Sequence, residues 1–444
     1  MAAAASDKAR FFLEQSVPEL QAFKEKGIFT PSEITAIASK RSSFEHRINM
    51  AGVPTPTDFA RYASYEMNLD LLRKKRCKRM GVRGTNFAGQ KRVFGVLERG
   101  LQKFPGDLAL WMQYLEFCRD ERANSKLAKG ITKVLRLHPT KWELWVWAAR
   151  FYFDVQGDMA MARSYLQRGL RFCEREREMW VQYLRLEMVY VTKVNARRKI
   201  LGLDEEKKDF EEETDKDRFL EADEIALPSI TAADLDAGRS ETSLAIDDAT
   251  IKSLAKSPAL SGAIPMAITE AAAKTFNSSA AVLEDLFDCV AAFNDVPCTP
   301  KILQQILNGM SVQSRQAQSE AIRTACEARF EVAGVDTQSP EFIRAFQRAR
   351  ARLNAIPRDS SESQMIAESR MLLVTFPRLN EKDVVVEEVV AVLEAITKKS
   401  LAELKKIANS KEHRRNDPLT WLEKKLVGHG VRREVLAEYG IGAG

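Results

Sequence analysis

A near-constant spacing between tryptophans constrains the fold of this chain more than any other feature. Trp111, Trp145 and Trp180 lie 34 and 35 residues apart, and each opens a stretch that is rich in apolar residues. A fixed period of this length is typical of stacked helix–turn–helix repeats. The sequence therefore predicts an all-α fold, a superhelical solenoid of helix pairs.

A second landmark keeps the same register. Twelve residues before each tryptophan begins a short motif: Arg99-Gly100-Leu101, Lys133-Val134-Leu135 and Arg168-Gly169-Leu170. Midway between motif and tryptophan stand Pro105, Pro139 and Glu174. Proline cannot continue a helix, so this midpoint is expected to be the turn between two helices.

The apolar residues around these landmarks follow helical spacing. Trp111, Tyr114, Leu115 and Cys118 occupy positions i, i+3, i+4 and i+7, which is one face of a helix. Val93, Val96, Leu97 and Leu101 give the preceding helix a similar face. Neither helix can bury its stripe alone, so stacking of several pairs is required for stability.

A helix with Trp-x-x-Tyr-x-x-x-Glu, followed by a helix with Arg/Lys-Gly-Leu and then Pro, resembles the HAT (half-a-TPR) repeat. Trp180-x-x-Tyr183-x-x-x-Glu187 matches in full, and Phe59-x-x-Tyr62-x-x-x-Glu66 matches with Phe for Trp. The other two copies depart from it: Cys118 and Tyr152 replace the Glu, and Ala148 replaces the Tyr. HAT repeats are known from RNA-processing machines. The repeat-core residues are expected to be Phe59, Tyr62, Trp111, Tyr114, Trp145, Trp180 and Tyr183.

The segment before the repeats narrows the resemblance. An initial helix is followed by Pro18-Glu19-Leu20, Gly27-Ile28-Phe29-Thr30, Lys40-Arg41 and Phe44-Glu45. This order resembles the start of the HAT-repeat Utp-family (U-three snoRNA-associated) subunit of the UtpB complex, part of the small-subunit processome, and the likeness covers about residues 10–200. It implies a non-enzymatic nucleolar and nuclear scaffold for early pre-rRNA processing. Its implied partners are other UtpB subunits and processome proteins, with pre-rRNA or snoRNA in the same ribonucleoprotein.

Charge is distributed unevenly along the chain. Residues 1–201 contain 37 Lys or Arg against 21 Asp or Glu, whereas residues 202–444 contain 31 against 41. A basic half suggests contact with polyanions, and an acidic half suggests a solubilising or protein-binding role.

We expect an N-terminal helical arm or cap (1–56), a HAT-repeat block (57–201), an acidic, partly disordered linker (202–262) and a divergent helical C-terminal region (263–444) with a loosely packed tail from Ser410.

The densest run of cations lies between residues 73 and 92. Its candidate RNA or partner contacts are Arg73, Lys74, Lys75, Arg76, Lys78, Arg79, Arg83, Lys91 and Arg92. Such a patch can neutralise phosphates or an acidic protein, or act as a nuclear import signal. The plain alternative is a solvated helix end whose cations interact favourably with the helix dipole.

Trp142 and Trp147 do not lie on the predicted apolar face of the Trp145 helix and are candidate exposed contacts.

No motif indicates catalysis, a cofactor or a metal. There is no Gly-rich phosphate loop, the four histidines lie far from one another and from cysteines at metal spacing, and the six cysteines are scattered. No apolar run approaches the ~20 residues of a membrane span. Three alternatives to the processome scaffold remain: a HAT scaffold of splicing or mRNA 3′-end cleavage, a direct RNA-binding module that uses the basic half, and an enzyme with an unrecognised site.

Overall fold

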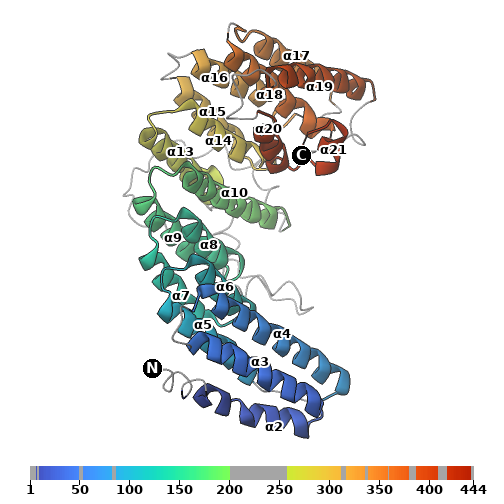
Figure 1. Cartoon of the computed structure of the whole chain (residues 1–444). Helices are drawn as coiled ribbons and strands as arrows, with labels where there is room; N and C mark the ends of the chain where they lie inside the picture. The colour runs from blue at the N-terminus through green and yellow to red at the C-terminus, as the bar shows by residue number, and fades with distance from the viewer. Residues whose placement is uncertain are drawn as a thin grey trace, which may run out of the picture. The chain divides into compact units, whose positions relative to one another are not determined.

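The protein is described by a computed structural model (Figure 1). The structure describes residue 7 and residues 10–49, 54–82, 87–200, 258–311, 317–335, 339–358, 360–379, 387–408 and 418–441. All regular elements in these ranges are helices, as the sequence predicts. The chain divides into two compact units, residues 1–141 and 142–444, and each is considered by itself.

In the N-terminal unit, helices that follow one another in the chain pack against each other (Figure 1). Its helices are α2 (Val17–Glu25), α3 (Pro31–Asn49), α4 (Pro56–Met80), α5 (Ala88–Lys103), α6 (Leu108–Asp120) and α7 (Asn124–Leu137). The helix α4 is much longer than its neighbours α5 and α6. Its C-terminal part carries the first half of the basic stretch.

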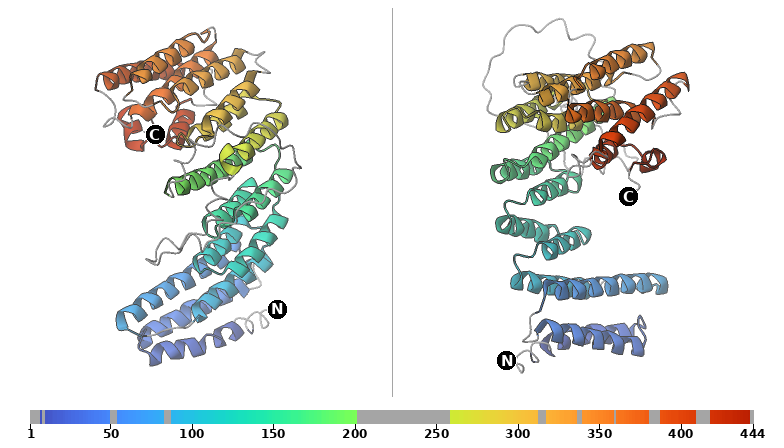
Figure 2. Two further views of the ribbon diagram at one scale, coloured as in Figure 1. Left: turned by 180° about the vertical axis from the view of Figure 1, so that it is seen from behind. Right: turned by 45° about the horizontal axis from the view of Figure 1, so that its top comes forward.

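The C-terminal unit continues with the same kind of helix hairpin, as both views of Figure 2 show. Its first helices are α8 (Trp142–Asp154), α9 (Met159–Phe172) and α10 (Arg177–Ile200). After the short 3-10 helix η3 (Pro258–Ser261) follow α13 (Ala263–Thr275), α14 (Ala280–Ala291), α15 (Thr299–Ser311), α16 (Ala317–Val332), α17 (Pro340–Asn354), α18 (Ser361–Leu379), α19 (Glu387–Ala408), α20 (Pro418–Gly428) and α21 (Arg433–Glu438).

Side-chain caps fix where several helices begin. Thr30 and Glu33 form the capping box that their spacing predicts, because the Thr30 amide donates to Glu33 at 2.9 Å and the Glu33 amide donates to Thr30 Oγ1 at 3.3 Å. Asp107 caps α6 by accepting from the Leu110 amide at 2.8 Å. Each cap satisfies a backbone N–H that has no partner within its own helix.

The six-residue offset between turn and tryptophan has a structural cause. The indole Nε1 of Trp111 donates to the Pro105 carbonyl at 2.7 Å. In the other unit, Trp180 Nε1 donates to the Glu174 carbonyl at 2.8 Å. Both rings are almost fully buried, so each indole N–H needs a partner inside the protein, and the turn carbonyl provides it. The position therefore accepts either proline or glutamate, because only its backbone oxygen is used.

The glycine of the Arg-Gly-Leu motif marks a close helix contact. A methyl group at Gly100 would lie 2.9 Å from Leu110 Cδ2 and 3.0 Å from Phe59 Cγ. A methyl group at Gly169 would lie 2.5 Å from Met179 Cε and 2.8 Å from Trp145 Cγ. In each unit, the glycine thus packs against an aromatic ring that opens a repeat and against the residue just before the next tryptophan.

The seven expected repeat-core residues are all buried, with exposed fractions between 1% and 6%. Trp142 and Trp147, expected to be exposed, are half-buried instead. Trp147 stacks on Phe151 with the ring planes 10° apart, and this contact covers part of its surface.

The C-terminal tail is packed more firmly than the sequence suggests. Leu422 and Leu426 on α20, together with Leu436 on α21, are buried against Phe376 on α18. The expectation of a loose tail from Ser410 is therefore wrong for residues 418–441. The apolar spacing in so short a segment was too sparse to reveal this contact, which spans about fifty residues of sequence.

The expected domain boundaries near residues 56, 201 and 262 stay predictions. Most of the expected acidic linker, residues 202–257, lies outside the described residues. None of the described helices is long and apolar enough to cross a membrane.

Candidate functional site

The basic stretch divides into cations that hold the fold and cations that face solvent. Arg73 is buried and donates to Asp70 Oδ1 at 2.9 and 2.7 Å. Lys74 pairs with both Asp70 and Glu121 at 3.0 Å. These two cations are engaged within the N-terminal unit, so their charges are largely compensated.

Arg76 ties α4 to the start of α3. It donates to both carboxylate oxygens of Glu33 at 2.8 Å, donates to the Ile28 carbonyl at 3.1 Å, and lies 4.7 Å from the centroid of the Phe29 ring. The hydrogen bond from Arg76 is the main cause that lowers the pKa of Glu33 to about 2. The arginine therefore anchors the N-terminal arm.

Arg92 belongs to a buried network below the basic stretch. It donates to Glu19 at 2.9 Å, and Glu19 also accepts from Arg41 at 3.3 Å. Arg41 is 1% exposed and holds both carboxylate oxygens of Glu66 at 2.8 and 2.9 Å. Arg99 makes a similar bidentate pair with Glu45 at 2.9 and 2.8 Å. Bidentate pairs of this kind fix geometry, so the network sets how α2, α3, α4 and α5 pack.

The remaining candidate cations stay available to a partner. Lys75, Lys78, Arg79 and Lys91 are exposed and form no ion pair with the residues that the structure describes. Arg83 lies outside the described residues. Leu71 and Leu72, which are 54% and 41% exposed, lie on the same helix as the first three cations. The solvent-facing part of the basic stretch is therefore about half the size that the sequence suggests.

Part of the chain is similar to a family of known proteins. Residues 13–95 match a family model. The model is that of "U3 small nucleolar RNA-associated protein 6". The matched segment runs from the N-terminal arm to the middle of α5, and it contains Glu19, Arg41, Glu66 and Arg92. The motifs from Pro18 to Glu45 and the Phe59 copy of the repeat thus lie in the segment that the family model matches, whereas the three tryptophan copies lie outside it.

Individual relatives are similar to less than half of the chain. The chain is 36% identical over 200 residues to the U3 small nucleolar RNA-associated protein 6 of Schizosaccharomyces pombe, over 44% of this chain and 41% of that protein. It is 29% identical over 208 residues to the human homolog, over 45% of this chain and 35% of the homolog. The chain therefore covers less than half the length of these relatives.

The buried glutamate Glu66 of α4 has a counterpart in the second unit. Glu187, the last residue of the Trp-x-x-Tyr-x-x-x-Glu motif on α10, is fully buried and accepts two hydrogen bonds from Arg163 at 2.7 and 2.8 Å. Arg163 lies on the preceding helix, 24 residues upstream, and Arg41 lies 25 residues before Glu66. A buried carboxylate needs such a partner, so the repeat glutamate and the upstream arginine form one structural unit.

One of the two copies without this glutamate, the Trp111 helix, also lacks the arginine. Cys118 stands in the glutamate position of the Trp111 helix, and the residue 24 positions upstream is Phe94. Phe94 packs edge-on against Phe117 at 4.8 Å and Tyr114 at 6.1 Å. An apolar contact replaces the ion pair. The sequence analysis did not predict that Arg41 and Arg163 pair with these glutamates. The similar offsets of 25 and 24 residues were a signal that could have shown it.

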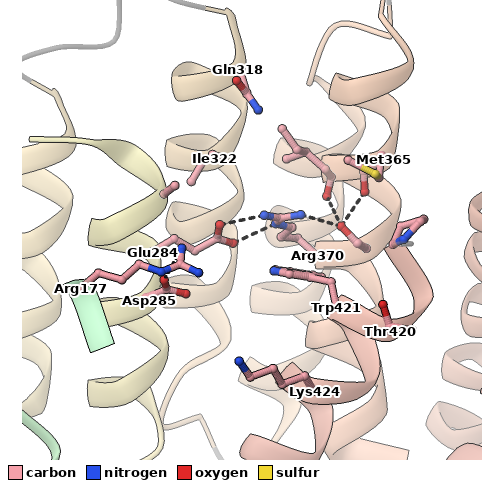
Figure 3. A pocket seen from close by; sticks show the side chains of 14 residues that line it. Arg177, Glu284, Asp285, Gln318, Ile322, Met365, Arg370, Thr420, Trp421 and Lys424 are labelled. Atoms are coloured by element: carbon pink, nitrogen blue, oxygen red, sulfur yellow. Dashed lines mark hydrogen bonds and ion pairs between the residues drawn. The ribbon is translucent and has the colours of Figure 1, made fainter. Parts of the chain in front are cut away.

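A concave site in the C-terminal unit has a volume of about 670 Å³ (Figure 3). Arg370 crosses its floor, donating to both oxygens of Glu284 at 2.8 and 2.7 Å and lying 4.2 Å from the centroid of the Trp421 ring. Arg177 pairs with Asp285 at 3.2 Å on one wall. The residues that line the site include no histidine or cysteine. Four of the charged groups form the two ion pairs Arg177–Asp285 and Arg370–Glu284, which hold helices together, and Lys424 also lines the site.

A second buried charge cluster lies nearby on α14, α16 and α20. Arg329 pairs with Asp288, which also accepts from Lys425, and Lys425 donates to Asp285 at 2.6 Å. Arg329 Nη2 lies 3.3 Å from His429 Nε2. Because an arginine can only donate, Nε2 is the unprotonated nitrogen of this histidine. Burial, and then the neighbouring Arg329, lower the pKa of His429 to about 4.

None of these clusters has metal geometry. Within the described ranges, no three His, Cys, Asp or Glu side chains are grouped so that they could hold an ion. The cysteines in these ranges are buried as free thiols, and burial raises the pKa of Cys118 to about 11. A thiol with a raised pKa is a poor nucleophile, and we assign it a packing role.

Proposed function

We propose that this chain is a non-enzymatic scaffold subunit of the nucleolar small-subunit processome. The observation that carries the proposal is the match of residues 13–95 to the family of U3 small nucleolar RNA-associated protein 6. The relatives are named for association with U3 small nucleolar RNA. The proposed role is to support early pre-rRNA processing through protein contacts within the UtpB complex.

We further propose that the helix pairs are HAT repeats. The equivalent Trp–carbonyl hydrogen bonds, the close contacts at Gly100 and Gly169, and the paired Arg and Glu of two copies support this reading. A repeat scaffold uses its extended surface for partner binding. We propose other UtpB subunits and processome proteins as those partners.

Direct RNA recognition by the basic half is the weaker alternative. Arg73, Lys74, Arg76 and Arg92 are occupied in intramolecular ion pairs. Counterion release depends on the number of phosphates that a surface neutralises, so this occupation reduces the expected RNA affinity. The family match also disfavours a splicing or 3′-end cleavage scaffold.

The test is affinity purification of the tagged chain from nuclear extract of its source cells, with and without RNase, followed by mass spectrometry. We expect UtpB subunits to be recovered and to resist RNase. Recovery of splicing or cleavage factors in their place would overturn the assignment. Loss of all partners on RNase treatment would instead favour the RNA-binding alternative.

A further inference from the structure

One groove of the N-terminal unit has a composition that the proposed scaffold role does not explain. It lies between α5 and α7, above the Trp111 helix α6, and has a volume of about 760 Å³. Its apolar part is formed by Leu101, Pro105, Trp111, Tyr114 and Leu137. Its charged residues are the four cations Lys126, Lys129, Lys133 and Arg136 and one acid, Glu98.

The cations of α7 all lie on the groove side. The helix reads NSKLAKGITKVLRL, and each of its four Lys and Arg residues lines the groove. Its other exposed positions, such as Ser125 and Thr132, are uncharged, and the helix contains no acidic residue. A charge run that served only solubility would be expected on the outer face.

Three of the four cations lack an acidic partner. Lys126 pairs with Glu98 at 2.9 Å and lies 4.1 Å from the centroid of the Phe94 ring. Lys129, Lys133 and Arg136 are exposed and form no ion pair with any residue that the structure describes. With a rise of ~1.5 Å per residue, these three charges form a row about 10 Å long.

Two apolar residues of the groove, Pro105 and Leu137, are exposed next to this row. Gly130 lets α7 approach α6 closely, because a methyl group there would lie 3.0 Å from Leu115 Cδ2 and 3.0 Å from Tyr114 Cε1. Leu137, at the end of the row, is 47% exposed. An exposed leucine beside buried rings offers an apolar ligand a place to bury surface.

We propose that this groove docks an acidic amphipathic peptide segment of a partner protein. The acidic side chains would pair with Lys129, Lys133 and Arg136, and the apolar side chains would cover Leu137 and Pro105. Because side chains three and four residues apart share one helix face, a helical segment with acids at this spacing matches the row. This inference rests on the proposed scaffold function and adds the chemistry of one partner.

The groove fits a protein segment better than RNA. Single-stranded RNA is usually bound by aromatic rings on which bases stack, whereas Trp111 and Tyr114 are only 4% and 6% exposed. An apolar floor contributes nothing to a phosphate backbone. Nucleic acid is therefore the competing outcome of the test.

The experiment measures fluorescence anisotropy with the purified full chain. The probe is a fluorescein-labelled peptide of about 15 residues, in which leucines recur every three to four positions and glutamates flank them. A peptide with glutamine for each glutamate and a labelled uridine oligonucleotide are the comparison probes. We expect the acidic peptide to bind at least ~10-fold more tightly than the glutamine peptide.

Two variants locate the site. Lys129→Glu/Lys133→Glu should weaken acidic peptide binding by roughly tenfold or more, and Leu137→Asp should also weaken it. The matched control, Lys26→Glu/Lys103→Glu, changes the net charge equally at exposed positions outside the groove and should leave binding unchanged. Circular dichroism checks that each variant is folded.

Several results would overturn the inference. They are equal binding of the glutamine peptide, equal loss in the control variant, or no effect of Leu137→Asp. Tighter binding of the oligonucleotide, lost in Lys129→Glu/Lys133→Glu, would identify a nucleic-acid surface instead. If UtpB subunits are still recovered in the purification, only this inference fails and the scaffold function remains.

Discussion

Single residues explain why the repeat pattern is visible in the sequence. Positions 100 and 169 require a small residue, because an aromatic ring of another helix packs directly on Gly100 and on Gly169. Trp111 and Trp180 occupy a fixed register because each indole N–H reaches a carbonyl six residues earlier. These constraints act on particular atoms, so they leave a signature at particular positions.

The first prediction compares two glycines of one helix. Gly100→Ala should destabilise the protein by about 1–3 kcal/mol, because the added methyl group overpacks the contact with Phe59 and Leu110. Gly95→Ala on the same helix meets nothing within 4 Å, and it should stabilise by roughly 0.5–1 kcal/mol through helix propensity. Urea unfolding followed by tryptophan fluorescence measures both. Equal effects of the two substitutions would refute the close-contact account.

The second prediction concerns the buried pair of Arg163 and Glu187. Arg163→Ala should cost about 3–5 kcal/mol, because it leaves a buried carboxylate without its partner. The exposed Arg168 on the same helix provides the control, and Arg168→Ala should change stability by less than ~0.5 kcal/mol. Replacing both members of the pair, in Arg163→Met/Glu187→Leu, should recover most of the loss. Thermal unfolding of the four proteins tests this, and a mild Arg163→Ala phenotype would count against it.

At the scale of elements, the sequence predicted the helices and their turns better than their charged contacts. Pro105 and Pro139 lie in turns, between α5 and α6 and between α7 and α8, as their positions in the repeat predict. The ion pairs escaped prediction because Arg41 and Glu66, or Glu284 and Arg370, are distant in sequence and meet only after packing. The basic stretch looked uniform for the same reason: the acids that neutralise Arg76 and Arg92 come from α3 and α2.

The third prediction is a pH dependence centred on α20. His429 follows the last residue of α20 and interacts with Arg329 on α16, Asp288 on α14, Lys425 on α20 and Arg185 on α10. Burial lowers its folded pKa to about 4, from about 6.5 when unfolded. Between these values the unfolded state binds more protons, so the free energy of unfolding should fall by up to about 3 kcal/mol as the pH decreases from 6.5 to 4.

His429→Gln should remove this slope while keeping an acceptor for Arg329. His46→Gln, at an exposed position, should retain it. Denaturant midpoints measured at several pH values between 4 and 7 make the comparison. Asp288 adds a separate dependence at lower pH, because Arg329 and Lys425 outweigh burial and hold the pKa of its carboxyl below the usual range. A slope unchanged in His429→Gln would show that another group titrates.

At the scale of the whole molecule, the sequence carries a family signal in one half and a fold signal in both. The family model matches residues 13–95, and the relatives match less than half of the chain. The described residues of the C-terminal half also form only helices as regular elements. The spacing of tryptophan and tyrosine gives no repeat register there. Partner identity lies in exposed side chains such as those of α7, and packing rules do not constrain these side chains.

We propose that the chain belongs functionally to the U3 small nucleolar ribonucleoprotein assembly. The most direct measurement is the amount of U3 small nucleolar RNA that co-precipitates with the tagged full chain, relative to a spliceosomal RNA in the same extract. We expect clear enrichment of U3 small nucleolar RNA, and we expect it to be retained in Lys129→Glu/Lys133→Glu. Absence of enrichment, or enrichment of the spliceosomal RNA instead, would contradict it.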